Sequence, residues 1–179
     1  SELPRFREGS SSLIAEDVTI RSAENGDSAS IARIHVEAWR DAYAALLPVD
    51  YLARLDPKIE AARWARSLGI GPNDRTLVAE VADSVVGYAS IGAARDRGSE
   101  AGEIYALYVE TDWREQGIGR ALVEPAFARF HRRGLTMAFI WCLEGNVAAR
   151  GFYSRCGGVL LGERRLESVR GIALPVVGF

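Results

Sequence analysis

Residues 103–120, EIYALYVETDWREQGIGR, decide the fold of this chain. The first seven, Glu103 to Val109, are rich in β-branched and aromatic residues and are typical of a buried strand. At Gly117 the apolar spacing changes to that of a helix, so Gly117 and Gly119 punctuate the turn between the two elements. Such a turn presents backbone N–H groups at the positive end of a helix dipole and predicts a phosphate or pyrophosphate site. A tight turn that merely needs glycine explains the pattern equally well.

The residues around this loop argue against two other phosphate-binding motifs. The sequence has no GxxxxGK[ST], so a P-loop is not predicted. A dinucleotide-binding fingerprint needs a third glycine after Gly119 and an acidic residue at the end of the next strand. Here Arg120, Ala121 and Leu122 follow instead, and Met137–Cys142 carries no acid.

Working outward, the hydrophobic periodicity predicts the remaining elements. Before the central stretch we expect a strand at Asp17–Arg21 and then a helix with an N-cap within Gly26–Ser28 and apolar positions from Ile31 to Ala42. Helices from Pro48 and at Ile59–Leu68 and a hairpin at Thr76–Ile91 follow. After it we expect a strand at Met137–Leu143, a helix at Asn146–Arg155, and strands at Val159–Leu166 and Ile172–Val177. This order predicts an α/β (α+β) fold, with one central mixed, mostly antiparallel sheet, helices on both faces and one βαβ crossover.

Composition narrows the class of protein. The 22 basic and 24 acidic residues leave a net charge of −2, so no basic field is available to bind nucleic acid. No apolar run approaches the roughly 20 residues of a membrane-spanning helix. Cys142 and Cys156 belong to no metal-binding pattern, so we expect free thiols, no metal and a cytoplasmic location. We also expect residues 1–16 to form a mobile tail and residues 17–179 a single domain.

With these motifs the chain resembles the GNAT superfamily of acyl-CoA-dependent N-acyltransferases. The central family motif, E-I-x-x-L-x-V followed by R/Q-x-x-G-x-G/A, stands here as Glu103–Val109 and Arg114–Gly119. The second motif, N-x-x-A-x-x-F-Y-x-x-x-G, stands as Asn146, Ala149, Phe152, Tyr153 and Gly157. Both motifs have the right order and spacing, and the resemblance extends from about Val18 to the end of the chain.

The resemblance implies acetyl-CoA (coenzyme A) as the co-substrate. In the family, the pyrophosphate lies on the backbone of the glycine loop and the pantetheine arm pairs with the preceding strand. A backbone N–H of that strand also holds the thioester carbonyl oxygen. The cofactor-binding residues implied here are Leu107, Tyr108, Val109, Arg114, Gln116, Gly117, Ile118, Gly119, Arg120, Asn146 and Phe152.

The resemblance also implies two catalytic residues. Glu103 matches the general base, which often works through a water, and strand alternation predicts that it shares a face with Tyr105 and Leu107. Tyr153 matches the general acid that protonates the departing thiolate. A solvated strand-end carboxylate and a core tyrosine are the plain structural alternatives.

The acceptor site is the least defined part of the prediction. Trp39, Tyr43 and Tyr105 are its candidate walls, although aromatic residues at helical spacing are also typical of a core. His35 fits a packed histidine better than a catalytic one.

The resulting prediction is an acetyltransferase that transfers acetyl from acetyl-CoA to a primary amine of a small molecule or to a peptide N-terminus. The alternatives are a non-catalytic acyl-CoA-binding or sensing module of the same fold, and a nucleotide-binding interaction domain. We expect no nucleic-acid or membrane partner, and a homodimer formed through the terminal strand pair Val159–Leu166 and Ile172–Val177, motivated by the apolar stretch Leu174–Val177.

Overall fold

The computed structural model describes residues 17–68, 75–95, 100–169 and 171–179. They form two compact units, one ending at Phe139 and one running from Ile140 to Phe179. The tail predicted at residues 1–16 lies outside the described residues. That residues 17–179 form a single domain stays a prediction.

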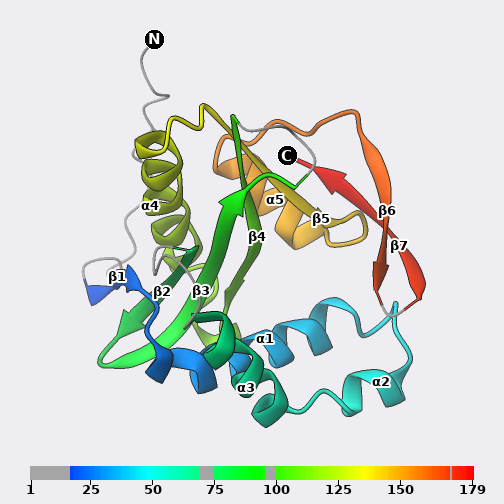
Figure 1. The fold of residues 1–179 in the computed structure, drawn as a ribbon. Helices are drawn as coiled ribbons and strands as arrows, with labels where there is room; N and C mark the ends of the chain where they lie inside the picture. The colour runs from blue at the N-terminus through cyan, green and yellow to red at the C-terminus, as the bar shows by residue number, and fades with distance from the viewer. Residues whose placement is uncertain (1–16, 69–74, 96–99, 170) are drawn as a thin grey trace. The chain divides into compact units, whose positions relative to one another are not determined.

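The first unit is built on an antiparallel sheet of four strands (Figure 1). These are β1 (Thr19–Ser22), β2 (Thr76–Val81), β3 (Ser84–Ala93) and β4 (Ala101–Val109), each paired with the next. The β2–β3 hairpin turns through Ala82 and Asp83, whose φ angles of 46° and 62° are positive. Two positive φ angles are what a tight type I′ turn requires. The predicted hairpin is therefore confirmed.

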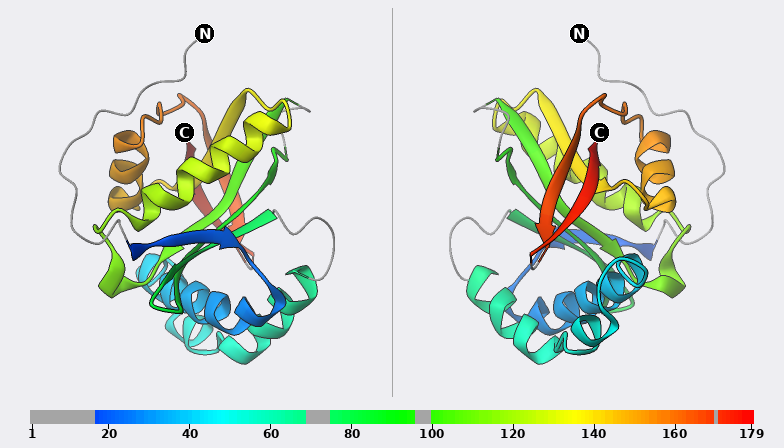
Figure 2. Two further views of the ribbon diagram at one scale, coloured as in Figure 1. Left: turned by 90° about the vertical axis from the view of Figure 1, so that its left-hand side faces the viewer. Right: turned by 90° about the vertical axis from the view of Figure 1, so that its right-hand side faces the viewer.

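Helices cover both faces of this sheet (Figure 2). Helices α1 (Ser28–Ala42) and α3 (Pro57–Leu68) pack on one face, linked through the short α2 (Val49–Ala53). Helix α4 (Ile118–Arg132) packs on the other face. The antiparallel sheet with helices on both faces, as predicted, is thus present within the first unit.

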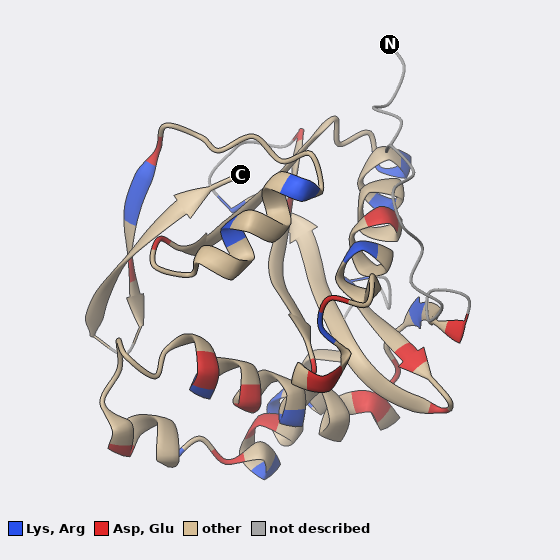
Figure 3. Cartoon of the chain, turned by 180° about the vertical axis from the view of Figure 1, so that it is seen from behind, with Lys and Arg blue, Asp and Glu red and all other residues tan. Residues whose placement is uncertain are grey.

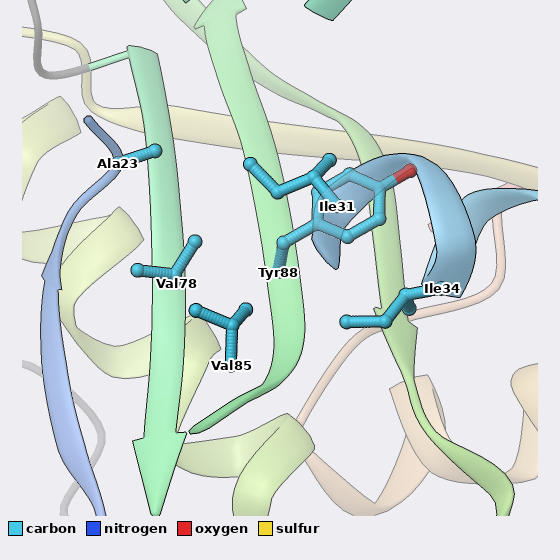
Figure 4. Close-up of a cluster of buried hydrophobic side chains, with 6 residues drawn as sticks. All are labelled: Ala23, Ile31, Ile34, Val78, Val85 and Tyr88. Carbon is cyan, nitrogen blue, oxygen red and sulfur yellow. The ribbon is translucent and has the colours of Figure 1, made fainter. Parts of the chain in front are cut away.

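The core on the α1 face joins aliphatic side chains to one tyrosine (Figure 4). Ile31 and Ile34 of α1 meet Val78 of β2 and Tyr88 of β3, and all four are almost fully buried. On the α4 face, Gly102 of β4 lies under the ring of Phe130. A Cβ at Gly102 would come within 2.5 Å of that ring, so only glycine fits there.

An ion-pair network fixes the start of α1. Arg21 of β1 donates to both oxygens of Asp27, at 2.7 and 2.9 Å, and to Glu80 of β2 at 2.6 Å. Asp27 ends the 3₁₀ turn η2 (Asn25–Asp27) and also accepts from the backbone N–H of Glu24. Burial alone would raise the pKa of Asp27, but the hydrogen bonds from Arg21 and Glu24 outweigh it and hold that pKa below its ordinary value.

The second unit contains a helix and a long hairpin. Strand β5 (Met137–Leu143) crosses the boundary, and its last three residues pair with β7 (Ile172–Gly178). Helix α5 (Val147–Arg155) follows, and β6 (Arg164–Val169) pairs antiparallel with β7. The chain order β4–α4–β5–α5 is the one predicted.

One predicted strand is misplaced. Residues 159–163 do not belong to β6, which begins at Arg164 opposite Val177 and ends at Val169 opposite Ile172. Because β7 ends at Gly178, Leu161 still finds a partner in the Gly178 carbonyl, whereas Val159 and Leu160 lie beyond the end of β7 and are exposed. The length of the partner strand, rather than the apolar run itself, sets where β6 begins.

Candidate active site

The glycine loop joins β4 to α4 through a strained turn. After the 3₁₀ turn η4 (Thr111–Trp113), Glu115 adopts a φ of 61° and Gly117 a φ of 86°. Gln116 stabilises the turn by donating its Nε2 to the Asp112 carbonyl at 2.6 Å. Positive φ is costly for residues other than glycine, so the shape of this loop is held against a local preference.

The loop is suited to an anion. Gly117 is the N-cap of helix α4 and gives it no side-chain cap, and a Cβ added at Gly117 would meet nothing within 4 Å. The first N–H groups of a helix have no partner inside the helix, so those of α4 are available to a ligand at its N-terminus. Backbone donors, a helix dipole and room for close approach together fit the pyrophosphate of coenzyme A.

The arginine side chains at the loop hold protein groups. Arg114 donates Nε to the Val109 carbonyl and Nη2 to Asp41 of α1, both at 3.2 Å. Arg120 lies 3.7 Å from Glu124, one turn along α4. Arg114 therefore ties the loop to the end of β4 and to α1, a role that its motif position did not indicate.

The backbone of β4 divides its hydrogen-bonding groups between two sides. The Glu110 N–H donates to Val86 at 2.9 Å, and Tyr108 stands opposite Tyr88 in the same register. In an antiparallel pair every second residue bonds the partner strand, so Tyr108 bonds β3 while Leu107 and Val109 turn their N–H and C=O groups away from it. Of the three predicted backbone positions, Leu107 and Val109 suit an added ligand strand, and Tyr108 does not.

A β-bulge in β4 changes the predicted strand alternation. Ser90 stands opposite Ala106, but Ile91 stands opposite Ile104, so Tyr105 is an extra residue. Gly102, which faces α4, and Glu103, its neighbour, therefore lie on opposite faces. The prediction that Glu103 shares a face with Leu107 is wrong because the bulge shifts the alternation by one residue. Its predicted neighbour Tyr105 does lie close, over Gly92, which stands opposite Glu103.

Glu103 is a buried carboxylate with a cationic partner. It is 1% exposed, and its side chain accepts the Arg95 backbone N–H at 3.0 Å and forms an ion pair with the Arg95 guanidinium. The alternative of a solvated strand-end carboxylate is therefore wrong. Arg95 is a site residue that sequence reasoning missed, because it lies in a charged loop without periodicity and meets Glu103 only through the β3–β4 pairing.

The predicted acceptor walls fall into two groups. The ring centroids of Trp39 and Tyr43 lie 4.7 Å apart, and those of Trp39 and His35 lie 5.1 Å apart. Because His35 also packs against Tyr108, Trp39 and Tyr43 extend an aromatic cluster that contains Tyr108. Tyr105 belongs to the Glu103 group instead: its hydroxyl donates to the Ala93 carbonyl at 2.5 Å. Burial, followed by the charge of Glu103, raises the pKa of Tyr105, so its hydroxyl stays protonated.

His35 belongs to the packed interior of the first unit. Its Nδ1 lies 2.7 Å from the Tyr88 hydroxyl, and burial lowers the pKa of His35 to about 4. Burial also raises the pKa of Tyr88 well above its usual value, so both groups are neutral at neutral pH. A packed, hydrogen-bonded histidine, as expected, describes this residue.

The second motif occupies α5 of the second unit. The Asn146 side chain accepts from the Ala149 N–H at 3.0 Å and caps the helix. Tyr153 is buried between Phe152 and Phe179, with ring centroids 5.2 and 5.7 Å away. The F-Y pair is thus packed within its unit, and Asn146 has a structural role whether or not it contacts a cofactor.

The family follows from a direct match. The model of the acetyltransferase (GNAT) family matches residues 31–158, more than half of the chain. The chain belongs to this family.

Relatives and solved structures agree with this assignment. An uncharacterized N-acetyltransferase of Bacillus subtilis, YuaI, is 33% identical over 164 residues, which cover 90% of this chain and 91% of YuaI. The structure of yncA, a putative acetyltransferase of Salmonella typhimurium with acetyl-CoA, has a TM-score of 0.66 and 25% identity, covering 90% of this chain and 91% of that one. The PaiA N-acetyltransferase of Thermoplasma acidophilum, in complex with coenzyme A, shares the fold with a TM-score of 0.63 and 16% identity, covering 89% and 97%.

Membership confirms several expectations. The chain has the GNAT α/β fold and is an acyltransferase of the N-acetyltransferase type, and acetyl-CoA is the cofactor of its structural neighbour yncA.

Among the described residues no cluster of three or more His, Cys, Asp or Glu side chains is placed to bind a metal ion, and no helix is long and apolar enough to span a membrane. Basic and acidic residues are interspersed along the described ribbon (Figure 3). The net charge of the chain is −2.

Proposed function

We propose that the enzyme transfers acetyl from acetyl-CoA to the primary amine of a small molecule or of a peptide N-terminus, with Glu103 as general base. The observation that carries this proposal is a buried carboxylate, Glu103, on the same strand as Leu107 and Val109, whose main-chain groups turn away from β3. One strand then carries both a proton acceptor and a backbone that can align a thioester.

The chain's own residues would divide the work as follows. When bound, acetyl-CoA supplies an activated thioester. The N–H groups of residues 116–120 would hold its pyrophosphate, and the main chain at Leu107 and Val109 would align its arm. Glu103 would take a proton from the attacking ammonium, directly or through a water.

Tyr153 is the proposed general acid, which donates its phenolic proton to the departing thiolate. Its ring is held by Phe152 and Phe179, so its side chain has little rotational freedom. A fixed donor needs no ordering at the moment of reaction, which favours proton transfer.

For the acceptor we propose a site lined by Trp39, Tyr43 and Tyr105. Support comes from the exposed ring of Tyr105 beside Glu103 and from the partly exposed pair formed by Trp39 and Tyr43. Aromatic faces attract ammonium groups, so such walls suit an amine.

The decisive experiment is an acetyl-CoA consumption screen against amino acids, polyamines, other small amines and peptides with free N-termini. An N-blocked peptide without lysine, which has no primary amine to accept acetyl, is the control in each panel. The proposal expects consumption of acetyl-CoA with at least one primary amine and none with the blocked peptide. Consumption with the blocked peptide equal to that with every amine would show hydrolysis rather than transfer and would reject the proposal.

We also propose a homodimer formed through the terminal strand pair, at β6. Leu174, Val176 and Val177 are buried within the chain, so this apolar stretch is not a contact surface. Strand β6 stands at the end of the strand order, and Leu166 on it is 69% exposed. If a second copy paired antiparallel about Leu166, Arg165 of each copy would face Glu167 of the other, a complementary arrangement.

Light scattering at micromolar concentration tests the dimer. The proposal expects twice the 19.5 kDa chain mass, and a monomer for Leu166→Glu, which places two like charges opposite each other. Val159→Glu is the control, because Val159 is equally exposed but lies outside β6. A monomeric wild-type protein would reject the homodimer.

For the location we propose the cytoplasm. Cys142 and Cys156 are both free thiols in the structure, as expected in a reducing compartment. Burial raises the pKa of Cys142 to about 11, so that thiol is unreactive at neutral pH.

A further inference from the structure

Arg95 surrounds the Glu103 carboxylate with donors from one residue. Its backbone N–H donates to Oε2 at 3.0 Å, and its Nε lies 3.2 Å from Oε1 and 3.3 Å from Oε2. Its Nη2 also donates to Oε1. Main chain and side chain of Arg95 thus act on Glu103 together.

These contacts leave Glu103 one position at which to accept a proton. A carboxylate offers about four lone-pair directions. The backbone N–H, the single hydrogen of Nε shared between both oxygens, and one hydrogen of Nη2 supply three donors. The remaining direction suffices for one water or one ammonium, so the ion pair with Arg95 still allows Glu103 to accept a proton.

The guanidinium is itself held in place. Its carbon lies 5.0 Å from the centre of the Tyr105 ring, within the range of a cation–π contact. That ring is anchored by the hydrogen bond to Ala93 and lies so close to Gly92 that a Cβ there would approach its hydroxyl to 2.3 Å. Gly92, Tyr105 and Arg95 therefore fix the orientation of the carboxylate from one side.

We propose that Arg95 is a positioning residue of the acetyl transfer, which holds the Glu103 carboxylate in one orientation and leaves its one remaining acceptor position for the amine. This inference rests on the proposed role of Glu103 as general base. A carboxylate that is 1% exposed loses most of its hydration, and a hydrogen-bonded cation is what compensates for that loss. Without Arg95, Glu103 would lose its cationic partner and its side chain would turn more freely.

The pH dependence of the reaction is therefore the informative measurement. Among the described residues, the charged and titratable groups recorded around this cluster are Arg95, Tyr105 and Arg75, which acts on Tyr105. Tyr105 stays neutral because burial raises its pKa. Arg95 is then the group whose removal changes the charge next to Glu103.

The test compares two substitutions at Arg95. In Arg95→Met, which keeps an apolar stem and the backbone N–H, kcat/KM for the amine should fall at least about tenfold at neutral pH, a part of the roughly 10²-fold contribution of a general base. The acidic limb of its pH–rate profile should move to higher pH. Arg95→Lys keeps the charge but loses the rigid set of guanidinium donors. The acidic limb of its pH–rate profile should therefore return to the wild-type position while its rate stays reduced.

The KM for acetyl-CoA should stay at the wild-type value in both Arg95 variants. The control Arg63→Met, which breaks an ion pair on α3, should behave as wild type.

A double substitution separates positioning from general stabilisation. If Arg95 acts through Glu103, then Arg95→Met in a Glu103→Gln background should cost almost nothing further. Losses in kcat/KM that multiply in the double variant would overturn the inference. So would a pH–rate profile of Arg95→Met that coincides with that of the wild type.

A ¹³C NMR spectrum of the Glu103 carboxyl at neutral pH reads the same coupling without turnover. Its chemical shift should move in Arg95→Met and hold in Arg63→Met, and an unchanged signal in Arg95→Met would overturn the inference. An enzyme that acetylates no amine yet shows this shift would instead count against the proposed function.

Discussion

The buried Glu103 carboxylate lies against Arg95, whose side chain is 60% exposed and reaches water. Replacing the carboxylate by an amide therefore leaves a cation that can turn to water rather than a stranded buried charge. The consequences of Glu103→Gln should lie in the chemistry more than in the fold.

For Glu103→Gln we expect kcat/KM to fall on the order of 10² at neutral pH, because an aliphatic amine is protonated there and needs a base. The deficit should shrink as pH rises, since solvent then deprotonates the amine unaided. A pH–rate profile measures this, with Glu60→Gln on α3 as a control that removes a paired surface carboxylate. A deficit independent of pH would remove Glu103 from the base role.

For Tyr153→Phe we expect acetyl-CoA affinity to hold and kcat to drop, because the ring packing against Phe152 and Phe179 survives while the hydroxyl is lost. High pH should not rescue this variant, since the missing step is proton donation to the thiolate. Calorimetry for affinity and steady-state rates from neutral to alkaline pH check both parts. Wild-type kcat would assign Tyr153 to packing alone.

The two catalytic candidates show what a motif can and cannot predict at the residue scale. Glu103 and Tyr153 stand at positions of the two family motifs, so the resemblance to the family implied them. Arg95 escaped because its contact with Glu103 arises from the pairing of two strands, and no local pattern records which loop residue that pairing brings near. Arg114 was found by position, but its contacts with Asp41 and Val109 depend on α1, which is distant in sequence.

At the scale of elements, α4 offers a matched pair of glycines. Gly117 precedes its first turn with a φ of 86°, Gly134 follows its last turn with a φ of 74°, and both have open space around them. Leucine at either position therefore pays the same kind of backbone strain, about 1–2 kcal/mol.

The cofactor should distinguish the two positions. At 100 times Kd, acetyl-CoA should stabilise the wild-type protein and Gly134→Leu by about 2.7 kcal/mol. It should leave Gly117→Leu unchanged, because the new side chain stands where the pyrophosphate approaches the backbone. Thermal or urea unfolding with and without acetyl-CoA measures this. Equal stabilisation of both variants would exclude Gly117 from the cofactor site.

Elements with strong periodicity were predicted well, and errors arose where tertiary pairing decided. The strand at Met137–Leu143 has the predicted bounds, and helix α1 lies where its N-cap and its apolar positions from Ile31 to Ala42 predict it, because each element carries its own apolar pattern. The start of strand β6 was predicted too early in the sequence, since the pairing with β7 sets where β6 begins. The bulge at Tyr105 was not foreseen, because two strands in partnership create it.

At the scale of the whole molecule, His35 links stability to pH. Its pKa of about 4 in the folded protein lies below the ordinary value near 6.5, because burial disfavours the charged ring. Between these values the unfolded chain binds a proton that the folded chain does not. The free energy of unfolding should therefore fall as pH drops from about 6.5 to 4, by about 3 kcal/mol at most.

The two histidines of the chain permit a direct comparison. His35→Gln should lower stability at pH 7, because the packing and the contact with Tyr88 are lost, and should flatten the decline in acid. His131→Gln, at the exposed end of α4, should keep the wild-type slope. Urea unfolding at half-unit steps of pH from 4 to 7 measures all three proteins. An unaltered slope in His35→Gln would show that other groups control this range.

The extra residue in β4 also constrains how this enzyme can change over evolutionary time. Losing one residue between Ile104 and Ala106 would return the strand to simple alternation and carry Glu103 to the side of the sheet that α4 covers. After that deletion Gly102 would take the face now held by Glu103 and would have to become the acid, while Ala101 would move under Phe130, where a Cβ has no room. Substitutions along β4 can therefore accumulate one at a time, but a change in its length must be accompanied by repacking against α4.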